Sequence, residues 1–215
     1  MKFGILGTGM VGEALASKLV ALGHEVKMGA RSAGNEKARA WVDKTDSSRA
    51  SQGSFADAAA FGDIVINAVQ GAATLSVVEA VIQPLADKVL IDVANPFDFS
   101  KGMPPTLFVS NDSSLAEAVQ ALAPRTKVVK TLNTMSAALM TDPSAVPGDH
   151  DVFVSGNDAA AKAHVIELLR SFGWKAPIDL GDLSSARGTE SMMLAWMRLW
   201  SALGTHEFNF HIARK

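Results

Sequence analysis

The chain of 215 residues contains no cysteine and no tyrosine. The first absence excludes a disulfide framework, a thiolate nucleophile and a cysteine-ligated metal site, and it suits a reducing compartment. The second removes one of the usual general bases of dehydrogenases that act on alcohols. Five histidines are present, but none has the spacing of a metal-binding motif such as H-E-x-x-H. We therefore expect no metal site.

The chain also lacks an excess of charge of either sign and long apolar runs. Twenty basic residues face twenty-two acidic ones, for a formal net charge of -2. This balance argues against nucleic acid or an anionic membrane as a partner. No apolar stretch reaches the roughly twenty residues of a membrane span, and after Lys2 the glycines of the first turn fall inside what would have to be the apolar core of a signal peptide. These features predict a cytoplasmic protein.

The first twelve residues carry the strongest motif in the chain. An apolar run from Phe3 to Leu6 leads directly into a G-x-G-x-x-G turn, which opens an apolar-periodic helix. In such a turn Gly7 permits the tight bend, Gly9 lets the backbone approach phosphates, and Gly12 lets the helix pack on the strand. The helix N-terminus then offers free N–H groups to an anion. The turn predicts contacts with a dinucleotide from Gly7, Thr8, Gly9, Met10, Val11 and Gly12.

The second predicted strand, residues 26–32, bears on which dinucleotide binds. NAD-binding sites usually end this strand with an acidic residue that accepts hydrogen bonds from the ribose, whereas this chain has Ala30 there. Arg31 offers a planar fork of donors, Ser32 a hydroxyl and Lys37 a point charge, all suited to a 2′-phosphate. We therefore predict NADP. The alternative is that these residues are solvated surface groups, which for Lys37 alone is the more common case.

Alternating strands and helices predict the fold class. Short apolar strands at 63–69, 88–93 and 127–132 are separated by helices, one of them expected over 72–86, and there is at most a short strand near Ser51 and Gln52. This order is typical of an α/β fold with a Rossmann-type, doubly wound, mostly parallel sheet. We assign residues 1–135 to an NADP-binding domain. We assign residues 136–215 to a small C-terminal α/β subdomain, with strands expected at 151–155, 176–180 and 208–212 and helices at 158–172 and 185–203. These strands should extend the main sheet or pack beside it.

The last predicted helix is apolar over an unusually wide arc. One stripe carries Met192, Trp196, Leu199 and Leu203, and the next carries Met193, Met197 and Trp200. This arc is wider than one sheet face needs to cover. Two interpretations follow: the helix contributes to the core and to a homodimer interface, or it lines a pocket for a flat apolar ring. The first is the more common arrangement.

The carboxyl ends of the central strands should face the nicotinamide. The residues expected there are Ala68, Val69, Asn95, Met135 and Ser136. They are neutral, and Lys130 is the nearest charge; it could act as a general base or have a structural role. Because no better base is evident, the sequence favours hydride exchange with a second ring-type carrier. In that chemistry the protein positions two rings and needs no catalytic side chain.

Several motifs together resemble the coenzyme F420-dependent NADP reductase family, and the similarity extends over essentially the whole chain. The segments that carry it are Gly7–Gly12, Gly29–Arg31, Lys130–Thr134, Val152–Asp158, Asp182–Glu190 and Phe208–Arg214. The resemblance implies a Rossmann domain with a small C-terminal subdomain, NADP on the glycine turn and Arg31, a deazaflavin stacked on the nicotinamide, and a homodimer. Similar domains also reduce flavin for a ferric reductase, so FMN or FAD are further candidates for the second carrier.

Two positions depart from the family pattern. The family often has serine where Ala30 stands, and Ser32 could replace that hydroxyl. It commonly has phenylalanine where Leu132 stands, which matters only if this side chain lines the second pocket. Two other functions stay open: an NADPH-dependent reductase of a small carbonyl or imine, and a non-catalytic sensor of NADP(H).

Overall fold

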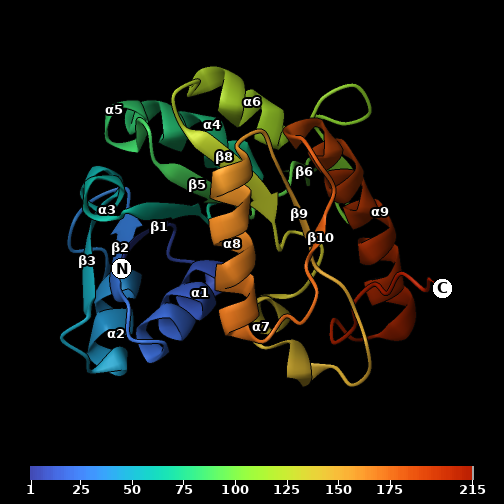
Figure 1. The fold of residues 1–215 in the computed structure, drawn as a ribbon, viewed down its shortest axis with the longest axis horizontal. Coiled ribbons are helices and arrows are strands. Elements are labelled where there is room, and N and C mark those ends of the chain that lie inside the picture. The colour runs from blue at the N-terminus through green and yellow to red at the C-terminus, as the bar shows by residue number, and fades with distance from the viewer. Residues whose placement is uncertain (215) are drawn as a thin grey trace.

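The computed structural model describes residues 1–214 and contains an eight-stranded sheet with helices on both faces (Figure 1). The strand order is β10-β9-β8-β5-β4-β1-β2-β3. The strands are β1 Lys2–Leu6, β2 Glu25–Ala30, β3 Ala50–Ser54, β4 Ile64–Asn67, β5 Val89–Asp92, β8 Lys127–Thr131, β9 Phe153–Gly156 and β10 Ile178–Asp179. The predicted fold class, a doubly wound and mostly parallel α/β sheet, is confirmed.

The sheet changes direction at one junction. Neighbouring strands are parallel except for β8 and β9, which pair antiparallel with Lys130 opposite Ser155. The segment between them, residues 132–152, joins two neighbouring strands of opposite direction and therefore needs no crossover helix over the sheet. β9 and β10 thus extend the main sheet, as expected. The division at residue 135 stays a prediction, because the same sheet runs through it.

Helices cover both faces, which is why the strands are apolar at nearly every position. One face packs against α1 Met10–Ala21, α2 Glu36–Thr45, α7 Ala137–Thr141 and α8 Ala159–Phe172. The other packs against α3 Phe55–Phe61, α4 Gly71–Ala80, α5 Ile82–Leu85, α6 Leu115–Leu122 and the start of α9 Ala186–Leu203. Alternate residues of each strand serve the two faces: Ile66 lies in the first core and Val65 in the second.

Three local predictions need correction. The helix expected over 72–86 is broken at Val81 into α4 and α5, because Pro84 has no N–H to donate to Ala80 and its ring would clash with that carbonyl. β3 is a full edge strand of five residues, paired with β2 along its whole length. The terminal strand expected over 208–212 is absent from the described residues, where this segment is an irregular tail.

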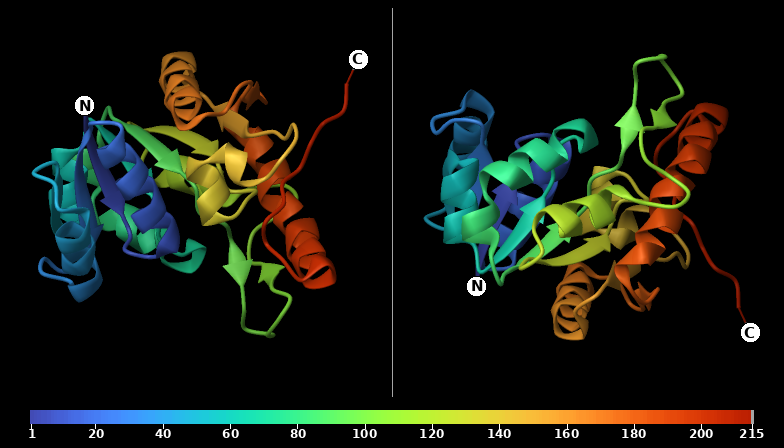
Figure 2. Two further views of the ribbon diagram at one scale, coloured as in Figure 1. Left: turned by 90° about the horizontal axis from the view of Figure 1, so that it is seen from below. Right: turned by 90° about the horizontal axis from the view of Figure 1, so that it is seen from above.

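A β-hairpin that follows β5 was not predicted. The short strands β6 Phe97–Asp98 and β7 Thr106–Leu107 form an antiparallel hairpin. Figure 2 shows it projecting from the body of the molecule beside α9. Two short 3-10 turns, Pro143–Ala145 and Leu183–Ser185, complete the elements.

Candidate functional site

The glycine turn opens onto a cavity of about 630 Å³ at the carboxyl ends of β1 to β4. Six of the residues expected at the nucleotide line it or stand at its rim: Gly7, Thr8, Gly9, Arg31, Ala68 and Val69. The other lining residues are Ala30, Asn35, Ser54, Phe55, Ala56, Gln70, Ala73, Ser76, Val77, Ala80 and Val81. The structure therefore brings three separate segments of the predicted site to one place.

The three glycines of the turn occupy different environments. Gly7 has a φ of +126°, and a Cβ there would lie 2.6 Å from the carbonyl oxygen of Ala68. A Cβ on Gly12 would lie 2.4 Å from the carbonyl oxygen of Gly7. Gly9 differs from both, because a Cβ there would meet no protein atom within 4 Å. The fold itself thus requires Gly7 and Gly12, whereas at Gly9 the protein leaves open space.

The first turn of α1 is suited to an anion. Its N-cap residue is Gly9, so no side chain caps the first N–H groups. The first backbone bond of the helix runs from Glu13 N to Gly9 O, and the preceding N–H groups have no intrahelical acceptor. Uncapped N–H groups at an open helix end bind phosphate well. The residues present therefore fit the pyrophosphate of a dinucleotide.

The far side of the cavity combines a cation with an apolar wall. Arg31 stands at the end of β2 with no carboxylate lining the cavity beside it. Phe55 from α3 and Val77 and Val81 around the end of α4 supply apolar surface suited to a flat base. This wall was not predicted, although the apolar residues Ala73, Val77 and Val81, spaced four apart after a strand end, indicate it.

Two predicted phosphate contacts lie elsewhere on the surface. Ser32 and Lys37 are exposed and do not line the cavity. Asn35, which was not predicted, does line it while its side chain caps α2 at Ala38 N, 3.2 Å away. In the glycine turn, Met10 is 84% exposed and Val11 packs on the core.

The remaining predicted residues gather where β5 and β8 end. The side chains of Asn95 and Asn133 form two hydrogen bonds: Asn95 Nδ2 donates to Asn133 O at 2.8 Å, and Asn133 Nδ2 donates to Asn95 Oδ1 at 2.9 Å. Met135 is buried, and Ser136 Oγ is a buried hydroxyl without a partner among the described residues. None of Asn95, Met135 and Ser136 lines the nucleotide cavity; they follow β5 and β8, the next strands of the sheet after β4.

Leu132 shapes the loop after β8. Its φ of +61° lies in the left-handed region, which non-glycine residues adopt at a cost of about 1–3 kcal/mol. Its side chain is buried in the core cluster on the face of α7. The exchange of phenylalanine for leucine at this position is therefore a matter of core packing.

Lys130 is not available as a general base, which corrects one interpretation of the sequence. Its side chain is 1% exposed, and its Nζ lies 2.8 Å from Asp92 Oδ2 and 2.9 Å from Glu190 Oε1. It also donates to the carbonyl oxygen of Ala94. Burial alone would lower the pKa of Lys130, but the carboxylates of Asp92 and Glu190 outweigh it and hold the pKa above its ordinary value.

The strand ends are therefore less neutral than the sequence suggested. Asp92 ends β5 and was not considered, and Glu190 comes from α9, sixty residues after Lys130. Glu190 also accepts from the N–H groups of Leu115 at 2.8 Å and Ala116 at 3.1 Å, so it caps α6. No local signal in the sequence pairs these residues, because the fold alone brings α9 to the end of β8.

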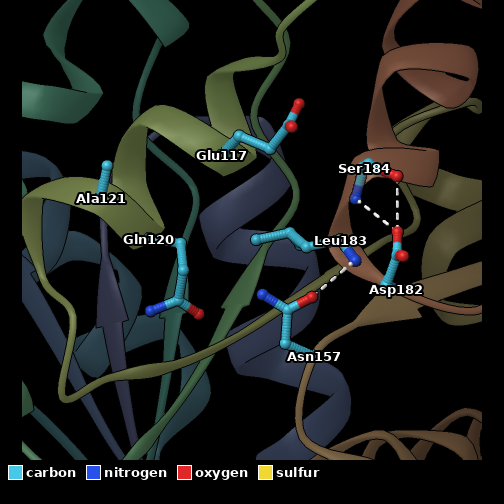
Figure 3. Close-up of a pocket in the computed structure, with 7 residues that line it drawn as sticks. All are labelled: Glu117, Gln120, Ala121, Asn157, Asp182, Leu183 and Ser184. Carbon is cyan, nitrogen blue, oxygen red and sulfur yellow. Dashed lines mark hydrogen bonds between the residues drawn. The ribbon is translucent and has the colours of Figure 1, made fainter.

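A second, shallower cavity of about 380 Å³ lies between α6 and the turn before α9 (Figure 3). Its polar side chains already have hydrogen-bond partners, either within the lining or in neighbouring segments such as Arg187, which bonds to Glu117. Asp182 Oδ1 accepts from Ser184 N at 3.0 Å, and Asn157 Oδ1 accepts from Leu183 N at 3.0 Å. No predicted site residue lines it, and its contacts cap turns.

The outer half of α9 carries an apolar cluster. Met193, Trp196 and Met197 are buried against Phe97, Phe208 and Phe210. Trp196 and Phe208 stack with ring centroids 5.3 Å apart, and Trp196 Nε1 has no hydrogen-bond partner among the described residues. The helix thus contributes both to the core and to an aromatic surface near the end of β5.

Residues 1–214 contain neither the side-chain cluster of a metal centre nor the long apolar helix of a membrane span. These residues hold no cluster of three His, Asp or Glu side chains arranged to ligate a metal ion. None of their helices combines the length and apolar character needed to cross a membrane.

Comparisons with known proteins agree with this geometry. Residues 2–96 match the family model described as NADP oxidoreductase, coenzyme F420-dependent. The chain is 33% identical over 202 residues to the F420-dependent NADP reductase of Methanocaldococcus jannaschii, covering 89% of each protein. It is 32% identical over 200 residues to metalloreductase STEAP3 of Rattus norvegicus, covering 93% of this chain and 38% of that one.

A solved structure gives the strongest of these matches. The crystal structure of a proposed F420-dependent NADP reductase from Arthrobacter sp. FB24 is 50% identical, with a TM-score of 0.94 and full coverage of both chains. By contrast, the chain spans well under half the length of the rat metalloreductase. The glycine turn, the strand order and the similarity over the whole chain lead to one conclusion: this protein belongs to the coenzyme F420-dependent NADP oxidoreductase family.

Proposed function

We propose that this protein transfers hydride between NADP(H) and a flat ring carrier, with coenzyme F420 as the first candidate. The observation that carries this proposal is the cavity at the glycine turn. It combines an uncapped helix N-terminus, open space at Gly9, and Arg31 with no neighbouring carboxylate in the lining. This set fits a pyrophosphate and a 2′-phosphate.

The chain's own residues would hold and orient NADP. The N–H groups at the start of α1 would bind the pyrophosphate, and Arg31 the 2′-phosphate. Ser32, next to Arg31 in the chain, and Lys37, in the first turn of α2, are exposed outside the cavity lining and are further candidates for phosphate contacts. Ala68 and Val69, followed by Asn95, Met135 and Ser136, would form the floor for the nicotinamide at the strand ends. NADP supplies the hydride when it is bound.

The second substrate follows from the lack of a proton carrier. Lys130 is tied to two carboxylates and cannot accept a proton from an alcohol. Hydride exchange between two rings needs only proximity and alignment. The names of the relatives point to F420 in one case and to metal reduction in another, so F420, FMN and FAD are the carriers to test.

A reductase of a small carbonyl or imine is the second candidate. It would need a proton donor close to the strand ends, where the uncharged candidates are Ser136, whose hydroxyl is unpaired, and the two asparagines. A sensor that binds NADP(H) without turnover is the third. The family membership favours the first candidate over both.

One spectrophotometric screen separates the three. Oxidation of NADPH is followed at 340 nm with F420, FMN or FAD, and separately with small carbonyls and imines. Turnover with a ring carrier supports the proposal, whereas turnover with carbonyls or imines alone would contradict it. Binding of NADPH without any turnover would support the sensor.

We also propose a homodimer built on α9. Four large apolar side chains of this helix are exposed: Leu194, Leu199, Trp200 and Leu203. The neighbouring hairpin segment exposes Phe99, Met103 and Phe108. A patch shared by two elements is typical of an interface between copies. Light scattering should give a molar mass twice that of the chain, and Leu203→Glu should reduce this value to the mass of a single chain.

A further inference from the structure

Three charged side chains are buried together beneath the strand ends. Asp92, Lys130 and Glu190 are 0%, 1% and 2% exposed. Asn67 joins them, since its Nδ2 donates to Asp92 Oδ1 at 2.6 Å. Asn67, Asp92 and Lys130 are register neighbours on adjacent strands, so their side chains form one row across the sheet. This arrangement is more elaborate than a helix cap requires.

The cluster has an excess of negative charge. Every hydrogen bond of its two carboxylates comes from a donor: Glu190 accepts from Lys130, Leu115 N and Ala116 N, and Asp92 accepts from Lys130, Asn67 and Ala94 N. Two carboxylates and one ammonium leave a formal charge of minus one. The N-terminus of α6 offsets about half of it.

Neighbouring groups do not remove this excess. The next ion pair, Arg187 with Glu117, is neutral as a whole. The Oδ1 of Asn67 is a buried acceptor with no partner among the described residues, which adds a further negative dipole. A buried charge excess is screened far less than one at the surface.

The row lies directly under the loops that would hold the nicotinamide. Asn67 precedes Ala68, which lines the nucleotide cavity. Lys130 donates to the carbonyl of Ala94, next to Asn95. The nicotinamide ring carries a positive charge in NADP⁺ and none in NADPH, so an anionic cluster at this place acts on the two forms differently.

We propose that the buried cluster of Asp92, Lys130 and Glu190 stabilises bound NADP⁺ relative to bound NADPH, and so biases the protein toward giving hydride away. This inference rests on the proposed function, in which NADP occupies the glycine turn. At an effective dielectric constant of about 20, a unit charge acting over roughly 10 Å changes an equilibrium about tenfold. For a two-electron couple this corresponds to about 30 mV.

The test is the ratio of two dissociation constants. Binding of NADP⁺ and of NADPH is measured separately by calorimetry for the wild-type protein and for Glu190→Gln. Removing the negative charge should weaken the binding of NADP⁺ relative to that of NADPH, and so raise the ratio Kd(NADP⁺)/Kd(NADPH) by about tenfold. Asp92→Asn makes the same charge change from strand β5 instead of helix α9, and it serves if Glu190→Gln does not fold.

A matched control isolates position from charge. Glu167→Gln changes the charge equally, but its side chain lies on α8 and pairs with Arg170 at the surface; its ratio should equal that of the wild type. If the cluster had only a structural role, Glu190→Gln would weaken the binding of NADP⁺ and NADPH equally. A ratio of dissociation constants that stays unchanged while both ligands still bind would overturn this inference but leave the proposed function standing. If the wild-type protein bound neither form, the proposed function would fail as well.

Discussion

The nucleotide cavity and the C-terminal helix are held in place by different kinds of contact. The cavity is shaped by backbone approaches between elements of the first eighty residues, such as Gly12 against the carbonyl of Gly7. α9 is anchored instead by long-range polar contacts, with Glu190 on Lys130 and Thr189 O accepting from Asn133 Nδ2 at 3.0 Å. The first kind of contact tolerates no added atom, and the second tolerates no lost partner.

The largest expected effect is on the anchor of α9. Lys130→Met would leave Asp92 and Glu190 buried without their counter-ion, and should destabilise the protein by about 3–5 kcal/mol. Urea unfolding measures the loss. Lys44→Met removes a lysine from an exposed pair with Glu13 and should change stability by less than about 1 kcal/mol. Equal effects from both substitutions would show that the buried ion pairs of Lys130 do not anchor α9.

The glycine turn separates fold from ligand. Gly12→Ala places a Cβ 2.4 Å from a backbone oxygen and should destabilise the fold by about 1–3 kcal/mol or more. Gly9→Ala meets no protein atom, and its φ of −81° suits alanine, so the melting temperature should stay near that of the wild type. We expect Gly9→Ala nevertheless to weaken NADPH binding at least about tenfold, since the phosphates need that space. Full NADPH affinity in Gly9→Ala would argue against a nucleotide at this turn.

Cofactor preference should depend on Arg31. We expect NADPH to bind at least about tenfold more tightly than NADH, and Arg31→Ala to erase most of that difference. Titration by nicotinamide fluorescence measures both constants. Lys37→Ala is the control, and its effect should be smaller because Lys37 does not line the cavity. Equal affinities of the wild-type protein for both nucleotides would contradict the NADP assignment.

The smallest effect concerns a second link between α9 and α6. Arg187 and Glu117 form a bidentate ion pair, and its hydrogen bonds hold the pKa of Glu117 below its ordinary value of 4.5. A lowered pKa stabilises the fold above pH 4.5, and this contribution is lost as the pH falls through the folded value. Arg187→Met should therefore cost less than about 1 kcal/mol at pH 7, since the pair is partly exposed.

Unfolding at several pH values tests this link. The gap between Arg187→Met and the wild type should shrink below pH 4.5, as Glu117 becomes protonated in both proteins. A gap that stays constant down to pH 3 would show that Arg187 acts through packing of its alkyl chain.

Much of the fold could be predicted from local patterns. The apolar strand before Gly7, the helix after it and the alternation up to residue 132 each follow from a few neighbouring residues. The apolar wall of α4 was not predicted. Nor was the full length of β3, because Gly53 and Ser54 are poor strand formers and adopt the strand only because β2 pairs with them. The terminal strand was wrong because Phe208 and Phe210 pack as single aromatic anchors rather than in a ladder.

The sequence by itself determined the glycine turn, the place of Arg31 at the end of a strand and the family, because each depends on residues adjacent in the chain. Only the tertiary structure decided the role of Lys130. Its two partners lie 38 and 60 positions away, on β5 and α9, and nothing short of the folded sheet brings two carboxylates to one ammonium. Local spacing specifies backbone geometry, whereas a buried charge takes its chemistry from whatever the fold places around it.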